Sequence, residues 1–267
     1  MSTTTTTTTT TTPHIISTPP QYAWQTGPMK LIPTPKFTTG EKDDFAHSAS
    51  EMALVHNCII RAFNTIYHQA PHIIPSDYVS FTSYCISTWE CLEAHHTGEE
   101  EFMFPEIQKL TGIQDLMAIN ISQHAAFHTG FHAWGAWLQA VHAGTETFDG
   151  KKCVELMDAF TEPLAQHLAE EIPTILGLRE YKDVLDIRAL MKAEAEKVMA
   201  AMSKTTQLPL IFLNHDVTYE GGIHNFPPVP TPVVWVLREV FGRWHASWWK
   251  FAACSYDGKP KDLHVKG

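Results

Sequence analysis

The stretch HHTGEEEFMFPEI, residues 95–107, decides the fold of this chain. It places His95 and Glu99 four residues apart, about one helical turn, so both side chains project from the same face of a helix. The same spacing recurs twice downstream, and a single histidine stands upstream; the full set is His56, His95, Glu99, His124, His128, His167 and Glu171. These five imidazoles and two carboxylates could together line a pocket for two metal ions.

Apolar residues around these positions repeat in steps of three and four, the period of a helix that packs one face on a core. The pattern predicts four long helices over about residues 41–69, 77–110, 114–142 and 149–175. Pro163 lies inside the last and is expected to kink it. All seven candidate ligands fall on the apolar stripes, and the stripe of the third helix is expected to run through Ile121, His124, His128 and Phe131. A polar group buried on such a stripe costs a few kcal/mol unless it is satisfied, and a metal would satisfy all of them. His96, Glu100 and Glu170 are expected to lie outside the ligand set.

The predicted fold class is therefore all-α, an antiparallel four-helix bundle with metal ligands on facing helices. A fifth helix, about Val184 to Met202, is expected to pack outside the bundle. We divide the chain into a disordered Thr/Pro-rich tail and lead-in (1–40), the bundle with its fifth helix (41–203), and an irregular C-terminal extension (204–267) packed on the bundle.

The extension carries a second polar cluster, His215, Asp216, Glu220 and His224, next to two glycines. Two interpretations remain open from the sequence. These residues either fix a glycine-rich turn, or line an entrance above the metals. Four tryptophans supply apolar surface for docking the extension: Trp235, Trp244, Trp248 and Trp249.

Composition excludes several classes of function. The net charge of −10 and pI near 5.8 argue against a nucleic-acid or anionic-membrane partner, since both need clustered basic residues. No apolar run reaches the roughly 18 residues of a membrane span. The five cysteines are odd in number and form no CxxC pair, which is typical of reduced thiols in an intracellular protein. The sequence thus predicts a cytoplasmic protein.

Iron suits the donor set best, because imidazole and carboxylate bind it well and thiolate ligands, typical of structural zinc, are absent from the set. Two six-coordinate ions offer about twelve positions, and the seven side chains with a bridging oxo or hydroxo group leave about one for dioxygen. Manganese or zinc is the chemical alternative. A ferritin-type site is disfavoured, since only Glu93 to His96 has the Glu-x-x-His spacing that such sites use twice.

The motif at residues 95–107 resembles the hemerythrin-like HHE motif, in which a glutamate follows a histidine by four residues and a Phe-Pro pair comes next. The strings LVHNCIIRAFNTIY, QHAAFHTGF and HLAEEIPTIL resemble the remaining ligand segments in the same order, so the resemblance spans about residues 45–180. It implies a hemerythrin-type bundle around a non-haem di-iron centre, with all seven ligand positions filled.

Members of that family act as oxygen carriers, oxygen or redox sensors, iron stores or oxidative enzymes. We predict a protein that binds and activates dioxygen to oxidise a small organic substrate, because residues 204–267 could add the walls that a substrate pocket needs. Glu171 stands where carrier-type members tend to have an aspartate at a slightly different spacing, which disfavours a simple carrier. The alternatives are a reversible oxygen carrier or store, and an iron or redox sensor.

Overall fold

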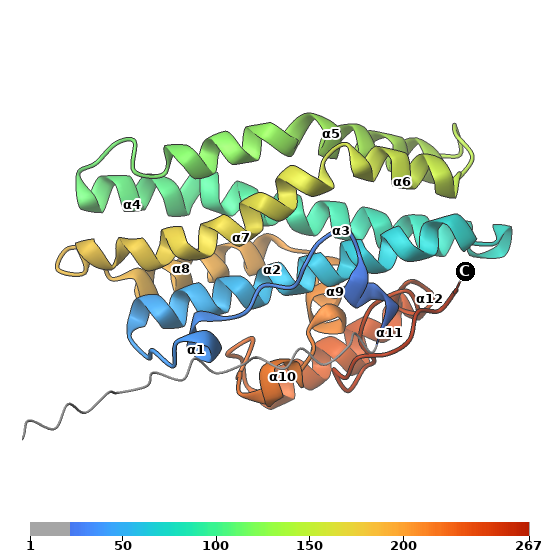
Figure 1. The fold of residues 1–267 in the computed structure, drawn as a ribbon. Coiled ribbons are helices and arrows are strands. Elements are labelled where there is room, and N and C mark those ends of the chain that lie inside the picture. The colour runs from blue at the N-terminus through green and yellow to red at the C-terminus, as the bar shows by residue number, and fades with distance from the viewer. Residues whose placement is uncertain (1–21, 267) are drawn as a thin grey trace, which may run out of the picture.

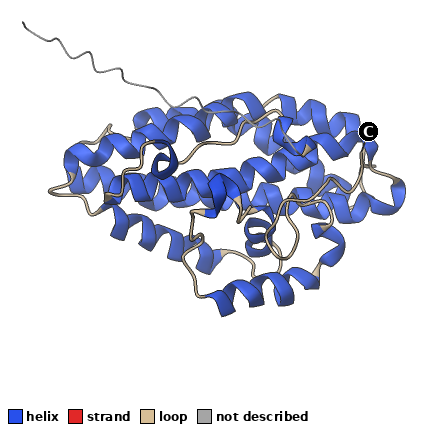
Figure 2. Cartoon of the chain, turned by 60° about the horizontal axis from the view of Figure 1, so that its bottom comes forward, coloured by secondary structure: helices blue, strands red, loops and turns tan. Residues whose placement is uncertain are grey.

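The computed structural model describes residues 22–266, and within them the chain is helical with no strand (Figures 1 and 2). Four helical segments run alongside one another as an antiparallel bundle, which confirms the predicted all-α fold class. The predicted tail, residues 1–20, lies outside the described residues. A short lead-in with α1 (Pro35–Thr38) precedes the bundle.

The first bundle helix, α2 (Asp44–Gln69), begins where Asp43 accepts hydrogen bonds from the backbone N–H groups of Phe45 and Ala46. That cap satisfies donors that a helix start otherwise leaves free. The helix is buried on nearly every side, because the bundle covers one face and the lead-in and extension cover the other.

The second segment comprises α3 (Tyr78–Gly98), a π-helical turn η4 (Glu99–Met103) and α4 (Phe104–Thr111). Pro105 has no N–H and its ring crowds the preceding turn, so the widened turn before it has a physical cause. The segment ends at Gly112, whose φ of 75° fits the left-handed cap that glycine favours.

The third helix, α5 (Ala118–His142), packs between α3 and the fourth segment. Gly135 permits this close approach, since a Cβ there would lie 2.3 Å from Nε1 of Trp89 on α3. The buried residues of α5 follow a seam with steps of three and four: Asn120, His124, Phe127, Phe131, Trp134 and Leu138.

The fourth segment is divided into α6 (Gly150–Asp158) and α7 (Thr161–Gly177). Asp149 caps α6 as the sequence suggests, by accepting from the N–H groups of Lys151 and Lys152. The expected kink at Pro163 is wrong in detail. The break lies before it, at residues 159–160, and Pro163 occupies the first turn of α7, where a proline costs nothing because that N–H would be free anyway.

Beyond the bundle, α8 (Ile187–Ala201) packs against α2, α3 and η4, and α9 (Gln207–Asn214) packs against α2 and α3. Residues 215–266 are irregular apart from short helical pieces: η6 (Tyr219–Gly222), α10 (Thr231–Trp235), η7 (Val236–Phe241), α11 (Gly242–Trp244) and α12 (Ala246–Trp249). Figure 1 shows this red and orange part below α2 and α3, with α5 on the opposite side of the bundle.

The tryptophans contribute less to docking than expected. Trp249 is buried, but Trp235 and Trp244 are 60% and 73% exposed. The buried anchor that sequence reasoning missed is Trp24 in the lead-in, whose indole N–H donates to the carbonyl of Lys261. The guanidinium of Arg61 on α2 lies over the Trp24 ring at 5.9 Å, so the lead-in, α2 and the extension are held together.

Glu220 joins the lead-in to the extension. Its carboxylate accepts from the N–H of Thr34 at 2.9 Å and from its hydroxyl at 2.6 Å, and it pairs with His224 at 2.7 Å. Asp216 accepts from the N–H and hydroxyl of Thr218. The local contacts, Asp216 with Thr218 and Glu220 with His224, favour the turn-fixing interpretation of the second polar cluster.

We expect Glu220→Ala to lower the free energy of unfolding by about 2–4 kcal/mol, because the buried Thr34 groups and His224 lose their partner. Denaturant titration measures this change. Glu239→Ala is the matched control: it removes an exposed pair with Arg243, and its effect should stay within about 0.5 kcal/mol. Equal effects from the two variants would contradict the role given to Glu220.

Candidate metal centre

Two groups of buried side chains lie side by side inside the bundle. One comprises His56, His95, Glu99 and Glu171, and the other comprises His96, Glu99, His124 and His167. Within each group the candidate ligand atoms all lie within 4.8 Å of one another. Glu99 belongs to both, so its carboxylate lies between two sites that could each hold a metal ion.

The imidazoles meet nitrogen to nitrogen. Nε2 of His56 lies 3.1 Å from Nε2 of His95, and Nε2 of His124 lies 3.0 Å from Nε2 of His167. The carboxylate of Glu99 is similarly close to the rings. Its two oxygens lie 3.1 Å from Nε2 of His95 and 3.4 Å from Nε2 of His124.

The hydrogen bonds of the Nδ1 atoms indicate which nitrogen of each ring carries the proton. Nδ1 of His56 lies 2.9 Å from the carbonyl oxygen of Leu168, and Nδ1 of His124 lies 2.7 Å from an oxygen of Glu100. Both partners only accept hydrogen bonds, so each Nδ1 carries the proton and each neutral ring turns an Nε2 lone pair inward. Inward lone pairs from several rings call for a cation.

The carboxylates give the same indication. Both oxygens of Glu99 and both of Glu171 are buried without a hydrogen-bond donor, as is Nε2 of His96. Leaving a buried acceptor unpaired costs about 1–3 kcal/mol, and more when the group is charged. Four unpaired carboxylate oxygens among imidazole lone pairs therefore fit a metal-binding site better than a structural core.

Burial sets the protonation of the metal-free site. Desolvation lowers the pKa of His95 and His96 well below the usual range and lowers that of His167 to about 2, with neighbouring histidines adding to each effect. Desolvation also raises the pKa of Glu99, followed by repulsion from Glu171 and Glu194. The rings of His95, His96 and His167 thus stay neutral, as metal coordination requires.

Adjacent histidines on α3 serve different groups. His95 and His96 are one residue apart, which corresponds to about 100° around a helix axis. His95 meets His56 on α2, while the ring of His96 packs 4.3 Å from that of His124 on α5. Sequence reasoning placed His96 outside the site, because it chose a single residue of this pair by seam phase. The two consecutive histidines of the motif, His95 and His96, were the signal that this reasoning missed.

His128 is the predicted ligand that the structure does not bring to the centre. It is exposed on α5, and its ring packs against that of His132 with centroids 3.9 Å apart and planes tilted by 44°. The predicted α5 seam ran through Ile121 and His128, whereas the actual seam runs through Asn120 and Phe127. Both seams share His124 and satisfy the helical period, so the error is one residue in rotational phase. The other six predicted residues lie in the two groups.

Polar side chains around the groups orient the rings. Glu100 and Glu170, expected to lie outside the ligand set, are exposed; Glu100 bonds His124, as described above. Glu170 accepts from the amide of Gln123, whose oxygen lies 3.3 Å from Nδ1 of His167. Such contacts fix ring orientation in metal sites.

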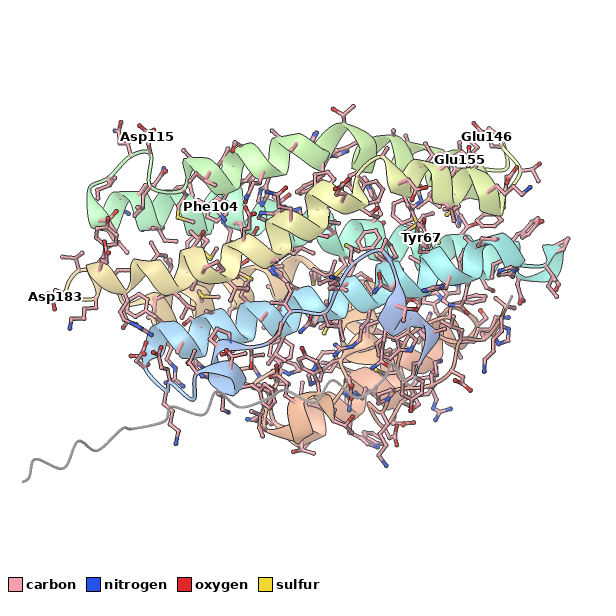
Figure 3. All side chains as sticks on the ribbon, viewed as in Figure 1. Tyr67, Phe104, Asp115, Glu146, Glu155 and Asp183 are labelled. Atoms are coloured by element: carbon pink, nitrogen blue, oxygen red, sulfur yellow. The ribbon has the colours of Figure 1, made fainter. Side chains whose placement is uncertain are left out.

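Aromatic rings enclose the second group. Phe104 points from α4 into the bundle (Figure 3) and packs 5.7 Å from the ring of His124. Phe127 lies 5.0 Å from the ring of His96 and 5.8 Å from that of His167. These walls limit water at that side of the centre.

The extension contributes to neither group, since no residue after Glu171 belongs to them among the described residues. It packs on α2 and α3 instead. A cleft of about 510 Å³ does form beside it, lined by residues of α3 and α5, the α8–α9 connection and Trp248, but no candidate ligand lines that cleft. The expectation that the extension forms walls of a substrate pocket stays a prediction.

Comparison with known proteins identifies the family of the chain. The hemerythrin HHE cation-binding domain model matches residues 47–177, and the chain belongs to this family. Over 251 residues it is 32% identical to the dimeric xanthone biosynthesis cluster protein R11 of Cryptosporiopsis sp. (strain 8999), an alignment that covers 91% of this chain and 93% of the relative. No solved structure matches significantly. Across residues 22–266, each helix is too short or too polar to traverse a lipid bilayer.

Proposed function

We propose that the protein is a non-haem di-iron protein that activates dioxygen to oxidise a small aromatic substrate. One ion takes His56, His95, Glu99 and Glu171; the other takes His96, Glu99, His124 and His167. The observation that carries the proposal is the inward convergence of imidazole lone pairs on unpaired carboxylates. Assigning His96 in place of His128 keeps seven protein ligands, four to each ion, with Glu99 shared.

Iron is favoured over zinc because neither group contains a thiolate, and imidazole with carboxylate is a donor set typical of non-haem iron. Four protein ligands on a six-coordinate ion would leave about two positions for small exogenous ligands. A ferrous pair bound by these side chains would supply electrons for the reduction of dioxygen, and an organic substrate would supply the remaining electrons.

The protein side chains have the accompanying roles. Leu168, Glu100 and Gln123 hold three of the imidazoles in one orientation through their Nδ1 atoms. Phe104 and Phe127 exclude water beside the second group. The substrate class comes from the relative, whose name assigns it to the biosynthesis of a dimeric xanthone, a polycyclic aromatic compound.

The test is anaerobic loading with two equivalents of ferrous iron, addition of a hydroxylated xanthone or anthraquinone, and a pulse of dioxygen. We expect dioxygen consumption coupled to an oxidised product that mass spectrometry detects. His124→Ala is the control and should abolish that coupling. Dioxygen uptake that reverses on degassing, with no product from any such compound, would replace this proposal by the oxygen carrier or store. Release of the bound iron after the dioxygen pulse, with no oxidised product, would favour an iron or redox sensor.

A further inference from the structure

Glu194 on α8 is a buried carboxylate with no role in the function proposed above. Only 7% of its surface is exposed, whereas its neighbour Glu196 on the same helix is exposed. Helix α8 lies beyond residues 47–177, the part of the chain that the family model matches. No hydrogen bond or salt bridge joins Glu194 to another described residue.

Gly98 shows where this carboxylate lies. A Cβ built on Gly98 would stand 2.6 Å from Oε1 of Glu194, so the oxygen occupies space that any other residue would fill. Gly98 immediately precedes Glu99. Glycine inside a helix costs about 1 kcal/mol relative to alanine, and here the missing side chain admits the carboxylate beside the metal ligands.

Position connects Glu194 to the first group. Helix α8 packs on α3 and on η4, the turn that carries Glu99, and Gly98 lies three residues after His95 on the same face of α3. Desolvation, followed by repulsion from Glu171, raises the pKa of Glu194 to about 7. Three acidic groups crowded together in an apolar interior oppose one another unless positive charge separates them. Two divalent ions bring four positive charges, and Glu99 with Glu171 remove only two.

We propose that Glu194 is a third carboxylate of the metal centre, supplied by α8, which accepts a hydrogen bond from water on the ion held by His56, His95, Glu99 and Glu171. It is a positioning residue, because it lies outside the set whose ligand atoms lie within 4.8 Å of one another. With Glu194 ionised, three carboxylates would offset three of the four positive charges that two divalent ions bring. This inference rests on the proposed dinuclear site but not on the reaction.

The test compares Glu194→Gln with Glu196→Gln, which removes the same charge from an exposed position on the same helix. Affinity for Zn²⁺ and anaerobic Fe²⁺ is measured by chelator competition, beside the melting temperature of the metal-free protein. We expect Glu194→Gln to weaken metal affinity about 10–100-fold, the usual effect of losing such a partner. Metal-free Glu194→Gln should melt no lower than the wild type, and Glu196→Gln should match the wild type in both measurements.

A further variant separates positioning from packing. Glu194→Asp keeps the charge and should retain more affinity than Glu194→Gln, and the visible spectrum of the Co²⁺-loaded protein should change only in Glu194→Gln. Wild-type affinity in Glu194→Gln, with two ions bound, would overturn this inference and leave the dinuclear site intact. A wild-type chain that binds fewer than two ions would overturn both. Two ions bound without turnover would refute only the oxidase proposal.

Discussion

Replacing Glu99 with glutamine is expected to reduce bound metal from two ions per chain to one or none. Glu99 is the residue common to both groups, and a neutral amide cannot bridge two cations as a carboxylate does. Loss of an outer partner usually weakens metal binding 10–100-fold, so loss of this shared ligand should weaken it by at least about a hundredfold. Metal analysis after gel filtration, with chelator competition, measures the change.

The same substitution should stabilise the metal-free protein at neutral pH. Burial and neighbouring carboxylates raise the folded-state pKa of Glu99 above its ordinary 4.5. A raised pKa means that its stabilising contribution is complete below about pH 4.5 and is lost as pH rises toward the folded-state value. Metal-free Glu99→Gln should therefore gain stability over the wild type as pH increases from 4.5 to 7.

Glu101→Gln is the matched control, because Glu101 is an exposed carboxylate on the same π-helical turn. It should bind two ions and keep the wild-type dependence of stability on pH. If Glu99→Gln still bound two ions with unchanged affinity, Glu99 would not be the shared ligand.

The second large effect distinguishes His96 from His128. We expect His96→Ala to lose the ion of the second group, since the buried Nε2 of His96 faces that group with no other partner. His128→Ala should keep both ions, because its exposed ring contacts only His132 among the described rings. Metal stoichiometry and the near-ultraviolet bands of the oxidised iron protein report the difference.

Circular dichroism measures helix content and shows whether either variant has unfolded. Both variants should remain helical, since the apolar residues of the α5 seam and of the buried face of α3 are unchanged. The opposite pattern, with metal lost in His128→Ala and retained in His96→Ala, would restore the ligand set expected from the α5 seam drawn through Ile121.

The bundle could be predicted from local signals that act independently of tertiary contacts. The side chains of Asp43 and Asp149 begin helices by accepting hydrogen bonds from nearby backbone N–H groups, and the left-handed conformation of Gly112 ends one. The π-helical turn at Glu99–Met103 could not be predicted as such. Pro105 indicates a disturbance, but the sequence does not say whether the helix bends, ends or widens.

The sequence predicted which helices carry the candidate site. It did not determine which face of each helix points into the bundle. A period near 3.5 allows two seams on α5, and the choice between Ile121 with His128 and Asn120 with Phe127 depends on how neighbouring helices pack. On α3 the buried arc is wide because α8 and α9 cover its outer side, so both His95 and His96 are buried. Single-seam reasoning assumes one covered face and therefore kept only one of them.

The extension shows a different limit. Turn chemistry was readable at Asp216, whose short side chain accepts from the backbone N–H of Thr218 two residues further on. The bond between Glu220 and the N–H of Thr34 was not readable, because the two residues are far apart in the sequence. The docking side of the extension was not readable, since that depends on distant partners such as Trp24 and Lys261. Neither group contains a residue of the extension among the described residues, so the candidate metal ligands come from the bundle alone.

The most direct test of the dinuclear centre is anomalous diffraction at the iron edge from crystals of the reconstituted protein. We predict two peaks about 3–4 Å apart, the usual separation in two-metal sites, one beside His56, His95 and Glu171, and the other beside His96, His124 and His167, with Glu99 between them. A single peak, or peaks outside this cluster, would contradict the account.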